Sequence, residues 1–422
     1  MTRTGGTLAA GVLALLVVGV AAGPARAELD ATAVANVAAG ATNNPLSVED
    51  GSPLPRTTDE FTLIRAGVHG RYVGPRSQQN LSYTYAGTFY AQTTAANTNA
   101  HDLLWNLLAS PTARTELQAQ VDGTYGRLNS LNPIATLGAM NTQNIAGAGF
   151  AGLPAGAVTY ASATASLNGI YRPTAVRTWS ELTTFTSFIP ISGPASKSFV
   201  VTQSGHFDRS WGRDALTLDL LGSYFDSLPT PPTPDNPGGL PGTRSLDVQA
   251  LAGWRHEFSP AAFVAANGGI VLLDTPGSGG TLSVEPVVSG TAHYQTKVAL
   301  AELIVSQSLQ LNVYLGQPLL VDGAIGRLVI PLDRLERLNL VGVGTAQRDW
   351  TFGPPVAVAV DLLAANVGLA FVPLTYPIVA AIDYTAEEQI GHMVNTTSYP
   401  SLHRQVVMLT LTATWGTNPA VR

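Results

Sequence analysis

Polar and apolar side chains alternate along much of this 422-residue chain, and the polar ones offer hydrogen bonds rather than a nucleophile. In the clearest segment Glu116, Gln118, Gln120 and Asp122 share one face of an extended strand, because successive side chains point to opposite sides. Such a face can replace part of the water around a hydrophilic solute without binding it tightly. We expect the following residues on a water-facing inner surface: Arg65, His69, Glu116, Gln118, Gln120, Asp122, Gln203, Asp219, Asp247, Gln249, Glu285 and His293.

Residues that could support catalysis or bind a metal form no recognisable motif. The histidines lack metal-ligand spacing, so we expect no metal and no cofactor. His206, Asp208 and Ser210 supply the residue types of a triad, but proximity in sequence does not make one. We therefore expect no enzyme, while a hydrolase with a His/Ser or His/Asp site at one rim of a barrel stays the third alternative.

The elements that must position these side chains are predicted to be strands. About 18 alternating segments follow one another, separated by clusters of Pro, Gly, Asn and Asp. They are Asp30–Thr42, Glu60–Tyr72, Gln79–Gln92, Asn99–Ala109, Thr115–Leu128, Val158–Ile170, Arg177–Ile189, Lys197–Arg209, Ala215–Asp226, Arg244–Glu257, Ala262–Asp274, Thr281–Tyr294, Val298–Asn312, Asp322–Pro331, Arg337–Gln347, Val356–Phe371, Ile378–Ile390 and Leu402–Trp415.

The last of these segments shows the strictest alternation. Val407, Leu409, Leu411, Ala413 and Trp415 share one face, and three threonines lie on the other. Taken alone, this strand fits either a soluble β-sandwich or a transmembrane barrel with its apolar face towards lipid. In the second case Leu409, Leu411 and Trp415 are candidates for the signal that barrel-assembly machinery reads at the C-terminal strand.

The connections and the composition favour the barrel. Short connections alternate with longer ones such as Asn43–Asp59, Asn129–Ala157 and Ser227–Thr243, as in outer-membrane barrels, and a sandwich has no reason for this alternation. Charged residues are only 12% of the chain and the net charge is −6, which argues against nucleic-acid binding. We therefore predict an all-β fold: a transmembrane antiparallel up-and-down barrel of about 18 strands in the outer membrane of a Gram-negative bacterium, surrounded by its lipids.

The N-terminal segment reads as a secretory signal peptide. Arg3 precedes an apolar stretch from Leu8 to Ala22, and Ala25-Arg26-Ala27 fits a small-x-small cleavage site. We expect a signal peptide over residues 1–27 and a single barrel domain over residues 28–422. The chain has no cysteine, so no disulfide framework contributes to its stability.

One long connection differs from an ordinary solvated loop. The segment Asn129–Ala157 carries no charge and holds many small apolar residues. We predict that it folds over or into the mouth of the barrel and narrows the pore.

The N-terminal third resembles a known family. The run Ala38-Ala39-Gly40-Ala41-Thr42-Asn43-Asn44-Pro45, then Asp59-Glu60-Phe61 and Val73-Gly74-Pro75-Arg76, is similar to barrels associated with exopolysaccharide secretion, with Asn43 where those barrels have an Asp. The resemblance implies a porin that lets a polysaccharide leave the cell, paired with a periplasmic polysaccharide export protein that lacks its own pore. It implies no catalytic residues. A general diffusion porin for small hydrophilic solutes is the main alternative.

Overall fold

The computed structural model describes most of the chain after the expected signal peptide. The described residues are 28–45, 57–129, 157–192, 196–229, 242–275, 282–312, 317–335, 337–351, 359–373, 377–394, 397–398 and 401–416. The expected signal peptide, residues 1–27, and the uncharged connection, residues 130–156, lie outside them.

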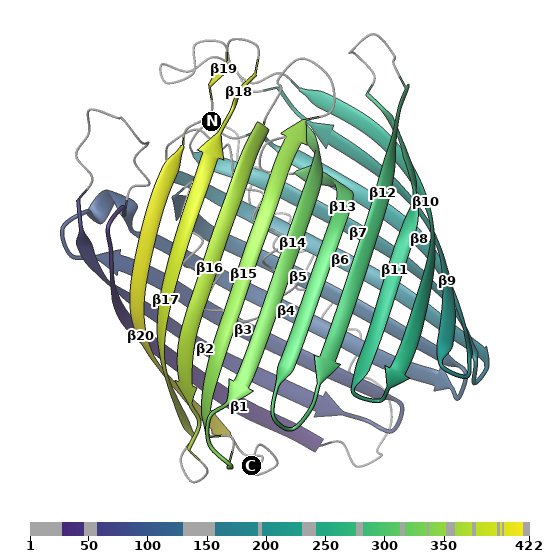
Figure 1. Cartoon of the computed structure of the whole chain (residues 1–422), viewed down its shortest axis with the longest axis horizontal. Helices are drawn as coiled ribbons and strands as arrows, with labels where there is room; N and C mark the ends of the chain where they lie inside the picture. The colour runs from purple at the N-terminus through teal and green to yellow at the C-terminus, as the bar shows by residue number, and fades with distance from the viewer. Residues whose placement is uncertain are drawn as a thin grey trace.

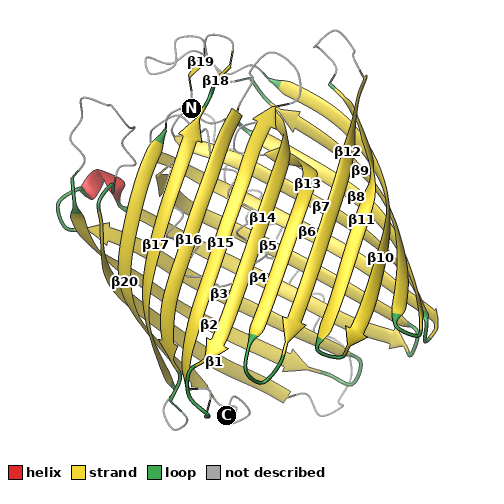
Figure 2. Ribbon diagram, viewed as in Figure 1, coloured by secondary structure: helices red, strands yellow, loops and turns green. Residues whose placement is uncertain are grey.

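The described strands form one 18-stranded antiparallel barrel (Figures 1 and 2). A separate short pair, β18 (Met393–Val394) and β19 (Thr397–Ser398), lies in the connection before the last strand, and η2 (Thr94–Ala96) is a single 3-10 turn. The barrel strands are β1 (Glu28–Thr42), β2 (Asp59–Val73), β3 (Ser77–Tyr90), β4 (Thr98–Thr112), β5 (Thr115–Asn129), β6 (Ala157–Thr174), β7 (Arg177–Ser192), β8 (Ser198–Trp211), β9 (Asp214–Ser227), β10 (Thr243–Ser259), β11 (Ala262–Asp274), β12 (Leu282–Gln295), β13 (Leu300–Asn312), β14 (Gln317–Pro331), β15 (Leu338–Thr351), β16 (Ala359–Phe371), β17 (Ile378–Gly391) and β20 (Leu402–Gly416). No helix among the described residues is long and apolar enough to cross a membrane.

The first and last strands close the ring. β1 pairs with β20 from Thr32 opposite Gly416 to Thr42 opposite Val406, and with β2 along its whole length. The predicted up-and-down barrel is therefore confirmed, and each predicted segment corresponds to one strand. The largest difference is at β14, which begins at Gln317 rather than Asp322. Its Pro318 is tolerated because it lies near the start of the strand.

The two faces of the barrel differ as the period-2 pattern predicts. On β20 the outward residues Leu409, Leu411 and Trp415 are 52%, 51% and 54% exposed, whereas Val406 on the inner face is buried. Aromatic side chains at both ends of the outer wall suit the two membrane interfaces, where one edge of the ring is apolar and the other wet. Near the short turns they include Tyr72, Trp179, Trp254, Tyr294 and Trp415, and towards the other end Tyr125, Tyr224 and Trp350. Trp105 and Tyr384, which also face outward, lie near the middle of their strands instead.

The connections differ between the two ends of the barrel. At one end tight turns such as residues 113–114, 175–176 and 212–213 join the strands, and at the other end residues 43–58, 130–156 and 228–242 intervene. In outer-membrane barrels short turns face the periplasm and longer loops the exterior, so both ends of the described chain lie on the periplasmic side. In the turn after β14, a hydrogen bond from the Leu338 N–H and the contact with Arg337 hold the pKa of Asp333 below its ordinary value.

The hydrogen-bonded wall is interrupted between β12 and β13. β13 pairs with β14 from Leu300 to Asn312, but with β12 only as far as Gln307 opposite Val288. Beyond Gln307 the outward side of β13 turns into the barrel, where Leu309 packs against Val271 and Val287 of the inner face. We call residues 308–312 with their partners 317–321 the inward hairpin end. At the outer mouth, this hairpin end contacts the neighbouring strands through apolar side chains, where the described residues of β12 and β13 no longer pair through their backbones.

Candidate functional site

The lumen is the candidate site, and the structure brings most of the predicted residues to it. Cross-strand register assigns each strand's inner face: Asn36 lies opposite Arg65, Asp102 opposite Thr124, and Asp219 opposite His206. By this register the predicted residues on the inner face are Arg65, His69, Glu116, Gln118, Gln120, Asp122, Asp219, Asp247, Gln249, Glu285 and His293.

Gln203 does not face the lumen, contrary to the prediction. It lies opposite Thr183 on the outer face of β8, where its side-chain amide donates to Glu181 Oε1 at 2.6 Å. Its neighbours Thr202 and Ser204 are also polar, so the sequence shows no alternation at this point. The buried Ser198 and Val200 fix the inner face of β8 on the even-numbered residues, which puts Gln203 outside.

A chain of polar contacts lines the inner wall of β5 and β6. Arg172 pairs with Glu116 at 3.1 Å, and Gln118 donates to Glu116 at 2.5 Å. Asn168 on β6 in turn donates to Gln118 Oε1 at 3.3 Å. These contacts hold the side chains against the wall and leave the centre of the lumen to solvent or solute.

A second polar band crosses β8 to β13. His206 Nδ1 lies 2.5 Å from Asp219 Oδ1, and His293 Nδ1 lies 3.7 Å from Glu302. Between them Arg255 contacts Glu257 at 2.8 Å and stacks over the Phe263 ring at 4.1 Å from its centroid. Glu302 and Arg255 were not among the predicted residues, although the same period-2 alternation places both on inner faces.

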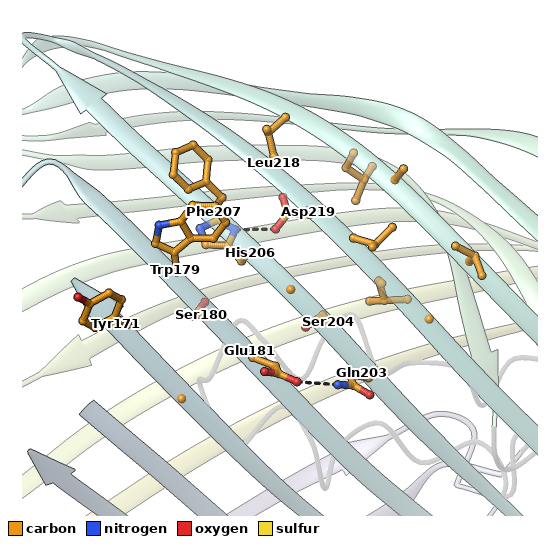
Figure 3. A pocket seen from close by; sticks show the side chains of 18 residues that line it. Tyr171, Trp179, Ser180, Glu181, Gln203, Ser204, His206, Phe207, Leu218 and Asp219 are labelled. Carbon is orange, nitrogen blue, oxygen red and sulfur yellow. Dashed lines mark hydrogen bonds and ion pairs between the residues drawn. The ribbon is translucent and has the colours of Figure 1, made fainter. Parts of the chain in front are cut away.

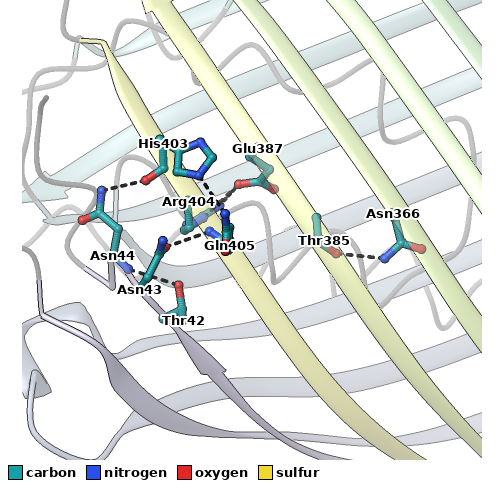
Figure 4. Close-up of polar contacts among 9 residues, drawn as sticks. All are labelled: Thr42, Asn43, Asn44, Asn366, Thr385, Glu387, His403, Arg404 and Gln405. Carbon is teal, nitrogen blue, oxygen red and sulfur yellow. Dashed lines mark hydrogen bonds and ion pairs between the residues drawn. The ribbon is translucent and has the colours of Figure 1, made fainter.

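Near the outer mouth the described inner wall carries a packed apolar cluster and a buried ion pair. Phe61, Leu63 and Tyr90 form a buried apolar cluster with Ala38 and Val406. Next to them Arg404 donates to Glu387 through Nε at 2.9 Å and through Nη2 (Figure 4). Arg404 is 1% exposed. The side-chain amide of Asn44 donates to the backbone carbonyl of His403, the residue before Arg404, at 3.3 Å. The Arg404–Glu387 pair joins β20 to β17, and the Asn44–His403 contact joins the end of β1 to β20. Sequence alternation alone gave no reason to single these residues out.

The rim-sited hydrolase has little geometric support in the described residues. His206 hydrogen-bonds Asp219, whereas the Ser210 hydroxyl donates to Asp208 at 3.4 Å and not to a histidine. A serine nucleophile needs its base within hydrogen-bonding reach. These two pairs are therefore separate parts of a polar wall.

Carboxylates outnumber arginines on the described inner face. The carboxylates are Asp30, Asp59, Asp102, Glu116, Asp122, Asp208, Asp219, Asp247, Glu257, Glu285, Glu302, Asp349, Asp383 and Glu387, and the arginines are Arg65, Arg71, Arg172, Arg255, Arg327 and Arg404. We predict that potassium permeates more readily than chloride, by a ratio of roughly three, because a lumen lined with one sign of charge concentrates counter-ions. The reversal potential of single channels in a KCl gradient measures this ratio.

Charge-neutralising variants test the source of this selectivity. Replacing Asp102, Asp122 and Asp219 by Asn should bring the ratio towards one. Asp214→Asn is the matched control, because Asp214 lies on the outer face and contacts His256 at 2.9 Å. A wild-type ratio at or below one would contradict the prediction.

No protein-family model matches this chain, and no curated protein matches it in sequence. Solved barrels do match its shape. The siderophore receptor PirA from Pseudomonas aeruginosa aligns at 9% identity and TM-score 0.47, over 93% of this chain and 81% of its own. OccK2 (OpdF) from Pseudomonas aeruginosa in complex with glucuronate aligns at 8% identity and TM-score 0.46, over 93% of this chain and 98% of its own. OccAB3 from Acinetobacter baumannii aligns at 7% identity and TM-score 0.47, over 92% of this chain and 99% of its own.

These matches carry no conclusion about a substrate or a partner. The argument for the membrane comes from the chain itself: a closed antiparallel sheet, an apolar outer wall, aromatic side chains at both of its ends and a polar inner wall. With these features the chain is an outer-membrane β-barrel of a Gram-negative bacterium, with a polar inner wall.

Proposed function

We propose that this barrel is the outer-membrane channel through which a polysaccharide leaves the cell. The observation that carries the proposal is a band of hydroxyl and amide groups across the inner wall. On β6 to β9, Thr164 contacts Thr186 at 3.3 Å and Thr202 contacts Ser223 at 3.4 Å. Near the closure Asn36 donates to Thr412 at 2.7 Å. Neutral donors and acceptors exchange hydrogen bonds with sugar hydroxyls at little cost, so a long neutral polymer can slide past them.

The resemblance of the N-terminal third to exopolysaccharide-secretion barrels supports the same cargo. In that arrangement a periplasmic polysaccharide export protein without a pore of its own delivers the polymer to the short-turn end of the barrel. A general diffusion porin for small hydrophilic solutes is the second candidate, because the same inner wall would also wet a small sugar. A hydrolase is the third, with the weak support described above.

A deletion strain separates the first two candidates. Loss of surface polysaccharide with normal growth on small sugars is the outcome expected for an exporter. Intact surface polysaccharide with slowed uptake of small sugars would refute export and support diffusion. Complementation with the wild-type gene controls for effects on neighbouring genes.

A single-channel recording tests whether the hydroxyl and amide groups of the inner wall contact a passing sugar polymer. Neutral oligosaccharides added to the short-turn side should block the current for times that lengthen with the polymer. The variant Thr164→Val, Thr186→Val, Thr202→Val keeps side-chain shape but removes hydroxyls, and should shorten the block severalfold. The control Thr62→Val lies on the outer face and should change nothing. Block times that are independent of the inner hydroxyls would contradict the proposed role of the band.

The uncharged connection, residues 130–156, gives a further prediction. If it narrows the mouth as the sequence suggests, replacing it with a short Gly-Ser linker should raise single-channel conductance about twofold or more, because current rises with the open cross-section. Shortening the Pro-rich connection, residues 230–241, is the matched control and should leave conductance unchanged. Equal conductance in the wild type and the first variant would show that this segment is no constriction.

A further inference from the structure

Two arginines face each other on the outer wall at the short-turn end. Arg177 begins β7 and lies directly opposite Arg209 of β8, and both are exposed. Residues directly opposite in an antiparallel pair have Cβ atoms only about 5 Å apart, and like charges in this position destabilise the sheet. The arrangement therefore calls for an anion between or beside the two guanidinium groups.

Two carboxylates on the same outer wall, Asp214 and Glu181, already have other partners. Asp214 accepts a hydrogen bond from Trp254 Nε1 at 3.0 Å and contacts His256 Nδ1 at 2.9 Å. Glu181 accepts from Gln203 at 2.6 Å. Within the described part of the chain, neither carboxylate forms an ion pair with Arg177 or Arg209. The positive charge of the pair is left for a group from outside the chain.

A hollow in the outer wall of β6 to β10 has Trp179 and Phe207 in its lining (Figure 3). Its volume is about 1140 Å³. Trp179 and Phe207, the next outward residues after the arginine pair, contact each other with ring centroids 4.5 Å apart and ring planes tilted by 49°. Leu218, Leu220 and Val248 form an apolar side. The floor is open at Gly205, where a Cβ would meet no atom within 4 Å.

The spacing of these features matches the depth profile of a lipid. Trp179 follows Arg177 by two residues, about 7 Å along the strand, which puts the cations at the headgroup level and the ring at the boundary with the hydrocarbon. Beyond the ring, the outward-facing residues that line the hollow are apolar except for Glu181 and Gln203, which hydrogen-bond each other; Ser180, Ser204, His206 and Asp219 also line it but belong to the inner face of their strands. A phosphate at the arginines would thus have an acyl chain leading into the hollow.

We propose that this surface binds one anionic phospholipid of the periplasmic leaflet. The phosphate lies between Arg177 and Arg209, the glycerol backbone lies beside Trp179, and one acyl chain fills the hollow over Gly205. A lipid with net negative charge is favoured over a zwitterionic one, because the ammonium group of the latter offsets the attraction of the two arginines. This site does not depend on what the lumen carries.

Native mass spectrometry of the purified full barrel tests the proposal. Delipidated protein in detergent is mixed with phosphatidylglycerol or with phosphatidylcholine, and the retained lipid is counted. We expect one phosphatidylglycerol to be retained in preference to phosphatidylcholine. Arg177→Gln with Arg209→Gln should weaken retention about 25-fold, since each basic residue near the surface contributes about fivefold.

Matched variants separate the two parts of the site. Arg76→Gln with Arg114→Gln removes the same charge from turns at the same end, and should leave retention unchanged. Gly205→Leu fills the hollow without altering charge, and should weaken retention severalfold. Gly326→Leu is its control, because it also has open space for a Cβ but lies on β14.

Three results would overturn the proposal. Equal retention of the two lipids would remove the role of charge. An equal loss in the Arg76/Arg114 control would make the attraction general to the rim. Full displacement of phosphatidylglycerol by millimolar inorganic phosphate, with Gly205→Leu behaving as the wild type, would reduce the site to a bare phosphate contact. Normal heat-modifiable migration of every variant confirms that each is folded.

Discussion

Replacing Leu409, Leu411 and Trp415 together by Arg is expected to abolish insertion of the barrel into the membrane. All three side chains project from the outer face of β20 and are about half exposed in the isolated chain. An arginine on the lipid face costs about 2–4 kcal/mol at the bilayer midplane and less near the interfaces. The summed cost of three such changes is comparable to the whole free energy of unfolding of a typical domain, about 5–15 kcal/mol.

The position of β20 makes the effect larger than the transfer cost alone. β20 pairs with both β17 and β1, so the ring cannot close if it fails to enter the membrane. Heat-modifiable migration in gels and protease resistance of outer-membrane fractions measure assembly. The control replaces Thr412 and Thr414 by Gln on the inner face of the same strand, and should assemble. Normal assembly of the triple variant would show that the outer face of β20 does not meet lipid.

The assembly signal is a separate question from lipid contact. Leu409, Leu411 and Trp415 remain candidates for residues that barrel-assembly machinery reads, and Trp415 is followed by seven further residues, Gly416 to Arg422. Adding each single variant to a cross-linking assay with that machinery would test recognition without blocking insertion.

The variant Arg404→Ala is expected to lower the free energy of unfolding by about 3–5 kcal/mol, because it leaves Glu387 as a buried charge without this partner. Both groups are almost fully buried, and two nitrogens of the guanidinium donate to one oxygen of Glu387. Urea unfolding of the barrel refolded into vesicles measures the loss.

Two further variants locate the origin of this effect. The double variant Arg404→Leu, Glu387→Leu removes both charges and should recover much of the stability, because apolar residues can replace a buried ion pair at little cost. Arg404→Lys keeps the charge but loses the planar fork, so it should fall between wild type and Arg404→Ala. A loss below about 1 kcal/mol for Arg404→Ala would place the pair in contact with water.

The strands could be predicted because each one places its side chains in turn towards lipid and towards the lumen, so apolar and polar residues must alternate along it. On β20 every outward residue is apolar except His403 and Gln405 at its start, so the register and both faces follow from the sequence. The prediction fails where polarity no longer distinguishes the faces. Thr202, Gln203 and Ser204 are polar in a row, so only the paired neighbours of β8 reveal that Gln203 points outward.

Other parts of the site depend on contacts between distant segments. Leu309 and Leu311 continue the apolar pattern of Leu303 and Val305, and read from the sequence they would face lipid. They are packed inside the barrel instead, against side chains of β10, β11 and β12. Likewise Arg404 becomes important only because Glu387 lies directly opposite it on β17. No local sequence pattern predicts either the packing of Leu309 and Leu311 or the Arg404–Glu387 contact.

The inward hairpin end also determines how the wall responds to strain. Around most of its circumference the barrel is a hoop of paired backbones, and widening a hoop means breaking hydrogen-bonded ladders. Between β12 and β13, among the described residues, this ladder ends at Gln307, and beyond it Leu309 packs against Val287 by apolar contact, which has little directional preference. We therefore expect the outer mouth to widen most easily between β12 and β13, because no backbone pairing between the described residues of these two strands beyond Gln307 has to break there. The short-turn end, where Leu300 to Gln307 remain paired, keeps a fixed bore.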